Sequence, residues 1–116
     1  PAIYGCAVVL SEETATEVGS QLLLNEIDRI TVRGKKTPFS IYQPLCERKE
    51  AGEVEKLYCE QYAEALRCYR EGTFSKAAEL WSTLHAEVSK ISSQRSDFLP
   101  AKVMADKAKR SQRDAP

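Results

Sequence analysis

The sequence predicts an α+β fold in which a short β-part precedes a helical part. Apolar residues alternate with polar ones over 27–42, whereas from Val54 onward they recur every three or four residues. A charged connection poor in apolar residues, CERKEAGEVEK, lies where the period changes. The 116 residues suffice for one core, and we divide them into segments 1–46 and 47–116.

A strand and a short helix are expected before the hairpin. The valine-rich run CAVVL predicts a strand over Cys6–Leu10. Ser11 is a favourable N-cap for a helix over about Glu12–Val18, and Gly19 is expected to end that helix in the left-handed conformation.

Residues 27–42 predict an antiparallel β-hairpin. The alternation begins at Ile27, stops across RGKKTP, and resumes at Phe39. Gly34 falls in the turn region, and Pro38 and Pro44 are expected to bracket the second strand.

Three helices are predicted after Gly52. The apolar stripe of the first ends before Gly72 and consists of Val54, Leu57, Tyr58, Tyr62, Ala65, Leu66 and Tyr69. The stripe of the second consists of Phe74, Ala77, Trp81, Leu84, Val88 and Ile91. The short connection EGT predicts antiparallel packing of these two helices. Pro100 suits the start of a last helix, and the charged end KAKRSQRDAP is expected to fray.

Composition excludes several classes of function. The 17 Lys and Arg balance the 17 Asp and Glu, so no net field favours nucleic acid or an anionic membrane surface. No stretch approaches the roughly 20 apolar residues of a membrane-spanning helix, and the first residues lack the charged-then-apolar order of a signal peptide. The spacing of the four cysteines fits neither a CxxC pair nor a disulfide framework, which favours free thiols.

Catalytic residues are scarce. The single histidine, His85, has no serine, cysteine or carboxylate placed to form a triad with it, so we assign it to a helix surface. No Walker-type loop, HExxH or EF-hand pattern occurs. We therefore predict no catalytic residue, no metal ligand and no cofactor in this chain.

Three cations flank the turn glycine: Arg33, Lys35 and Lys36 surround Gly34. Such a turn is able to hold a polyphosphate by charge-assisted hydrogen bonds, or it is simply a solvated turn. Charge spacing alone favours the solvated turn.

This sequence resembles the end of the catalytic domain of bacterial class III nucleotide cyclases in two stretches, YGCAVVLSEETATEVG and NEIDRITVRGKKTPFSIYQPL. Members of that family carry a YG, an apolar strand, an S-E-x-T helix start and an E-L-D-R-[IV]-x-V-K-G-[KR]-x-x-P-[VF]-x-[IV]-Y hairpin. The hairpin positions that match are Glu26, Asp28, Arg29, Val32, Gly34, Lys35, Pro38, Phe39, Ile41 and Tyr42. The resemblance spans about residues 4–45.

The resemblance implies the end of a ferredoxin-like catalytic domain whose parent makes cyclic AMP from the nucleoside triphosphate. Cyclic GMP stays open as the less favoured alternative, because the family's base-selecting residues lie outside the matched stretch. Two divalent ions, Mg²⁺ or Mn²⁺, would be held by aspartates that this chain lacks, so the chain alone is expected to be inactive. The family's triphosphate-binding cation falls on Arg33, where many relatives have lysine. Lys35 is a second candidate.

The helical part, ALRCYREGTFSKAAELWSTL, is similar to a tetratricopeptide-like helical hairpin. One such unit is fewer than a free solenoid needs, so we expect it to cap another part of the structure. The expected partners are the rest of the catalytic domain, a second copy in a homodimer, and ATP. The expected location is the cytoplasm, and any membrane anchor would lie upstream of this chain. Two alternatives stay open: a helical module for protein interaction, and a degenerate cyclase-like domain kept for regulation.

Overall fold

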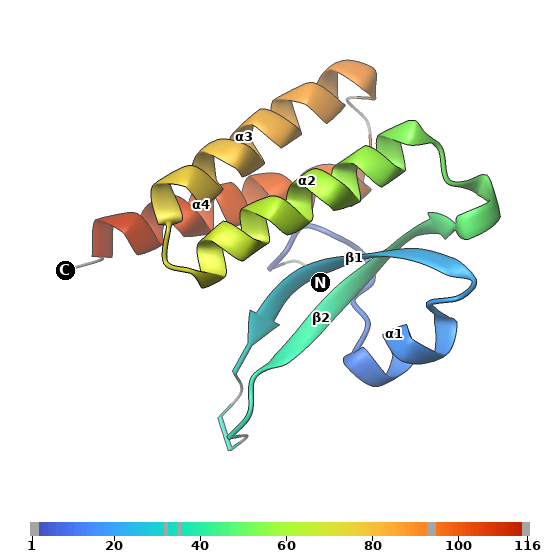
Figure 1. The fold of residues 1–116 in the computed structure, drawn as a ribbon, viewed down its shortest axis with the longest axis horizontal. Helices are drawn as coiled ribbons and strands as arrows, with labels where there is room; N and C mark the ends of the chain where they lie inside the picture. Colours follow the sequence, from blue (N-terminus) through green and yellow to red (C-terminus); the bar gives the residue numbers. More distant parts are fainter. Residues whose placement is uncertain (1–2, 32, 35, 93–94, 115–116) are drawn as a thin grey trace.

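A computed structural model describes residues 3–31, 33–34, 36–92 and 95–114. The elements are α1 (Glu12–Val18), β1 (Leu22–Ile30), β2 (Phe39–Glu47), α2 (Glu53–Arg70), α3 (Phe74–Ile91) and α4 (Leu99–Asp114), with 3-10 turns at Arg48–Glu50 and Ser96–Phe98. Figure 1 shows α2, α3 and α4 on one side of the two-stranded hairpin and α1 on the other. The predicted α+β fold is confirmed.

β1 and β2 form the predicted antiparallel hairpin, but both strands are longer than expected. β1 begins at Leu22, before the alternation at Ile27, and β2 continues past Pro44 to Glu47. The prediction that Pro44 ends the strand is therefore wrong. Pro44 pairs with Leu24 beside a shift in register, where a residue without an N–H is tolerated because the ladder is already irregular.

The N-terminal segment differs most from the prediction. Of the strand predicted over Cys6–Leu10, Leu10 alone pairs, through hydrogen bonds of 2.7 and 3.0 Å with the backbone of Tyr42. The chain enters α1 directly afterwards, so it leaves the sheet after a single bridge. The predicted left-handed cap at Gly19 is also wrong, because Gly19 is right-handed with φ of −62°.

The helical hairpin forms as predicted, with Gly72 at φ of 83° just after α2. Two residues of the predicted apolar stripes are nonetheless exposed, Leu57 by 40% and Ile91 by 63%. The predicted fraying is also wrong, because α4 remains helical to Asp114. Its last turns are held to α2, where the hydroxyls of Ser111 and Tyr69 lie 3.0 Å apart.

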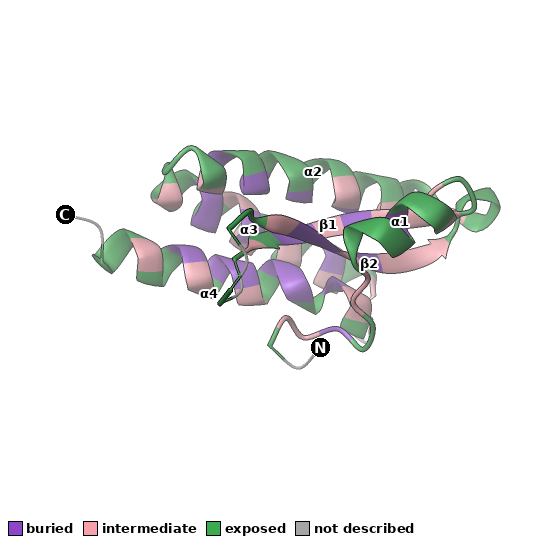
Figure 2. Ribbon diagram, turned by 90° about the horizontal axis from the view of Figure 1, so that it is seen from below, coloured by how far each residue is buried: buried purple, intermediate pink, exposed green. Residues whose placement is uncertain are grey.

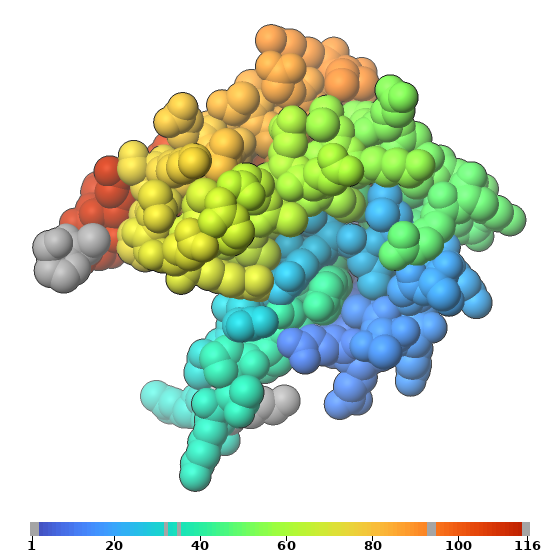
Figure 3. All heavy atoms as spheres, in the orientation of Figure 1, coloured from blue at the N-terminus to red at the C-terminus, as the bar shows by residue number. Residues whose placement is uncertain are grey.

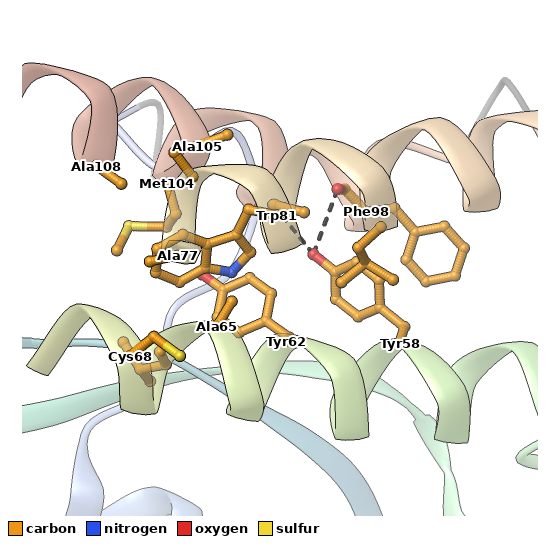
Figure 4. Packing of buried hydrophobic residues seen from close by; sticks show 14 of the residues in the cluster. Tyr58, Tyr62, Ala65, Cys68, Ala77, Trp81, Phe98, Met104, Ala105 and Ala108 are labelled. Carbon is orange, nitrogen blue, oxygen red and sulfur yellow. Dashed lines mark hydrogen bonds between the residues drawn. The ribbon is translucent and has the colours of Figure 1, made fainter. Parts of the chain in front are cut away.

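The main core lies among the three long helices. Figure 4 shows Tyr58, Tyr62, Trp81 and Phe98 filling it together with small side chains such as Ala77. The rings of Tyr58 and Phe98 stack at 4.5 Å, and those of Tyr62 and Trp81 meet edge to face at 5.4 Å. Figure 2 shows that α1, by contrast, is largely exposed.

Helices and hairpin are joined by buried hydrogen bonds. The Tyr62 hydroxyl donates to the Ile27 carbonyl at 2.8 Å, and the Gln43 amide donates to the Asp97 carbonyl at 2.9 Å. The helical segment therefore covers the inner face of the β-part, and the proposed division at residues 46 and 47 crosses a packed interface. None of the helices in the described ranges has the length and apolar character needed to cross a membrane.

Candidate functional site

The turn between β1 and β2 extends away from the body of the molecule (Figure 3). Gly34 adopts φ of 91°, a conformation that residues with a Cβ rarely take, so the glycine suits the turn as predicted. A Cβ at Gly34 would meet no atom of the described residues within 4 Å. Among these residues, nothing blocks the approach of a ligand to the backbone at Gly34.

The predicted cations lie at this turn. Arg33 and Lys36 are exposed, and neither makes a salt bridge or hydrogen bond with the described part of the chain. Lys35, the second candidate for triphosphate binding, lies outside the described residues. The turn thus presents at least two cations whose charge no described carboxylate neutralises.

A polar network that the sequence did not reveal fixes the base of the hairpin. Glu12 of α1 accepts a 2.5 Å hydrogen bond from the Ser40 amide, and the Ser40 hydroxyl donates to Glu26 at 2.5 Å. Glu26 also forms an ion pair with Arg70 of α2. Both strands are therefore tied to helices on opposite sides, while the turn beyond them extends into solvent.

A second missed feature is the buried carboxylate of Asp28, whose side chain is 3% exposed. Asp28 accepts hydrogen bonds from the Tyr4 hydroxyl at 3.1 Å and from the Lys107 ammonium at 2.5 Å. Burial and the Asp28 carboxylate raise the pKa of the Tyr4 phenol, which keeps the hydroxyl as a donor. No local pattern signals this cluster, because its members come from three distant segments.

A surface hollow lies beside the hairpin, and its lining does not include Arg33, Gly34 or Lys36. The hollow, of about 510 Å³, follows β1 and α2 and contains Glu26, Tyr42, Arg67 and Arg70. Its arginines are already paired, since Arg67 binds Glu71 at 2.8 Å and Arg70 binds Glu26. This hollow therefore offers little free charge to an anionic ligand.

Other candidate groups show no catalytic arrangement. His85 is half-buried on α3, and no cluster of three potential metal ligands occurs in the described ranges. All four cysteines are free thiols, as the spacing predicted. Burial raises the pKa of Cys59 to about 11, so its thiol is a poor nucleophile near neutral pH.

Comparisons with protein-family models, with curated proteins and with solved structures found no match to this chain. The resemblance to nucleotide cyclases therefore rests on the motifs of residues 4–45 alone.

Proposed function

We propose that this chain is the C-terminal portion of a class III nucleotide cyclase, in which the hairpin turn contacts the triphosphate of ATP. The observation that carries the proposal is an exposed turn with Arg33 directly before the positive-φ Gly34 and no described carboxylate to neutralise it. The ordered motif match over residues 4–45 supports the choice of family.

The chemistry of the turn suits phosphate better than a carbonyl or an apolar ligand. A guanidinium donates paired hydrogen bonds to phosphate oxygens, and its charge persists at every physiological pH. Gly34 leaves room for a phosphate to approach the backbone. Arg33 would therefore orient the triphosphate and stabilise its charge, with Lys35 as a second contact.

The rest of the reaction would depend on groups outside this chain. The two divalent ions, Mg²⁺ or Mn²⁺, would be held by aspartates of the remaining catalytic domain, and a second copy would complete the homodimer. By itself the chain would bind nucleotide weakly and convert none. This proposal also places the protein in the cytoplasm, where ATP is available.

Nucleotide titration of the isolated chain, followed by NMR, gives the first test. We expect ATP to shift the backbone amides of Arg33 and Gly34 with roughly millimolar affinity, as suits one or two exposed charge contacts. Arg33→Ala should remove the shifts. Arg113→Ala, at the exposed end of α4, removes the same charge far from the turn and should leave them intact.

Activity of the protein that contains the whole catalytic domain gives the second test. Arg33→Ala should raise KM for ATP more than it lowers kcat, because the contact exists before the transition state. Unchanged kinetics in this variant would remove the proposed function of Arg33.

One observation favours the alternative of a protein-interaction module. Val54, Leu57 and Ile91 line an apolar surface hollow of about 520 Å³ where α2 begins and α3 ends. If the chain is a protein-interaction module, substitution of Leu57 would weaken binding to a partner protein, whereas substitution of Arg33 would leave that binding unchanged. A degenerate, regulatory cyclase domain would instead show nucleotide binding without any activity of the intact protein.

A further inference from the structure

Asp28 joins three segments that are far apart in the sequence. It lies on β1, while Tyr4 precedes it by 24 residues and Lys107 on α4 follows it by 79. The Lys107 ammonium also lies 5.6 Å from the ring centroid of Tyr69 on α2. One lysine of the helical segment thus contacts both the hairpin and the neighbouring helix.

The burial of this carboxylate makes its partner important. Removing a charge from water is costly, and a buried carboxylate is tolerated when opposite charge and hydrogen bonds surround it. For Asp28, the hydrogen bonds come from Tyr4, from Lys107 and from the Arg29 amide at 2.8 Å. Lys107 is the one full positive charge among these three donors.

We propose that Lys107 is a positioning residue: through Asp28 it locks the turn-proximal end of the hairpin to α4, so that the helical segment sets the orientation of the cationic turn. Asp28 lies two residues before β1 ends at Ile30, and Arg33 follows shortly after. A consequence for triphosphate binding would rest on the proposed function, whereas the lock itself does not.

Loss of this lock should loosen one end of the hairpin and leave the remainder in place. Nearer the middle of β1, Glu26 is paired with Arg70, and the Ile27 carbonyl accepts a hydrogen bond from Tyr62. On β2, the Ser40 amide donates to Glu12 of α1. None of these three contacts involves α4. The expected signature is therefore local opening of β1 at residues 28–30, without unfolding of the helices.

Hydrogen exchange of backbone amides in the 116-residue chain tests the lock directly. In Lys107→Met we expect exchange at 28–30 to accelerate by at least about tenfold, because the buried carboxylate loses its counter-charge. Amides of α2 and α3 around Tyr62 and Trp81 should keep their rates. Lys102→Met is the matched control, since Lys102 lies exposed on the same helix, and it should change neither set.

Two results would overturn the lock: unchanged exchange at 28–30, or equal acceleration at 28–30 and in α2 and α3. The second outcome would mean that Lys107 contributes to global stability alone. Lys107→Arg, which keeps the charge, should restore slow exchange at the hairpin end, and failure to do so would also count against the lock.

The Asp28→Asn background covers the case in which Lys107→Met alone does not fold. Asp28→Asn removes the buried charge but keeps an oxygen for the Tyr4 hydroxyl, so adding Lys107→Met to it should cost much less than in the parent chain and should leave the double variant folded. A double variant that also fails to fold, while Asp28→Asn alone folds, would refute the coupling.

The nucleotide titration separates the lock from the proposed function. If Lys107→Met accelerates exchange at the hairpin end while Arg33→Ala leaves ATP binding unchanged, the lock stands and the triphosphate assignment falls. If Arg33→Ala abolishes binding but Lys107→Met leaves exchange unchanged, the assignment stands and the lock falls.

Discussion

Tyr62→Phe removes a single hydrogen bond between the helices and the hairpin. The pairing of the strands steps from Glu26 opposite Tyr42 to Asp28 opposite Ile41, so Ile27 has no partner residue across the ladder. Its carbonyl is instead satisfied by the Tyr62 hydroxyl at 2.8 Å. Both residues are fully buried.

The expected loss follows from this burial. Phenylalanine keeps the ring that contacts Trp81 at 5.4 Å, so packing is preserved and one hydrogen bond is removed. A buried acceptor left without its donor costs about 1–3 kcal/mol. We expect a decrease of about 2 kcal/mol in the free energy of unfolding, or about 30-fold in the equilibrium constant.

Trp81 supplies the assay, because it is the single tryptophan of the chain and is fully buried. Its fluorescence during urea unfolding gives the midpoint and slope for each variant. Tyr69→Phe is the control, since its hydroxyl meets Ser111 at a partly exposed position and should cost well under about 1 kcal/mol. Equal losses in the two variants would refute the argument that the unpaired Ile27 carbonyl depends on the Tyr62 hydroxyl.

Two further outcomes are expected. Gly5→Ala should destabilise more than Gly34→Ala in the same urea assay: both glycines have positive φ, worth about 1–2 kcal/mol, but a Cβ at Gly5 also lies 3.0 Å from Leu99. Equal losses of stability would show that the contact between the new Cβ and Leu99 is relieved at no energetic cost. The raised pKa of Cys59 predicts slow thiol modification at pH 8, accelerating toward pH 11. Because folding raises this pKa, the thiol's contribution to stability is complete below about pH 8.5 and is lost as pH rises through about 11, a loss that Cys59→Ala should reduce.

Local patterns predicted much of the secondary structure. The Ser11 N-cap and the acidic first turn placed the start of α1 as observed, and Gly34 and Gly72 lie in the turn and just after the helix as predicted, both with positive φ. These features depend on neighbours within a few residues, so one sequence suffices to predict them.

The contacts that fix the hairpin were not predictable in the same way. The ion pair of Asp28 with Lys107 spans 79 residues, and that of Glu26 with Arg70 spans 44. Within a strand, each of these carboxylates resembles an ordinary polar residue, and nothing near it in the sequence indicates a distant partner. The register shift between Glu26 and Asp28 changes which residues point inward, and a strict period of two does not predict such a shift.

The buried polar residues show how the two parts of the chain are oriented. Among the described residues, the buried polar or charged side chains are Asn25, Asp28, Ser40 and Gln43, and all four lie in the hairpin. The core of α2, α3 and α4 is apolar and aromatic. Apolar contacts tolerate sliding, whereas hydrogen bonds to buried groups demand particular distances and angles. The helices therefore supply most of the apolar burial, and the polar contacts specify how the hairpin sits on them, among them the contact of Lys107 on α4 with Asp28.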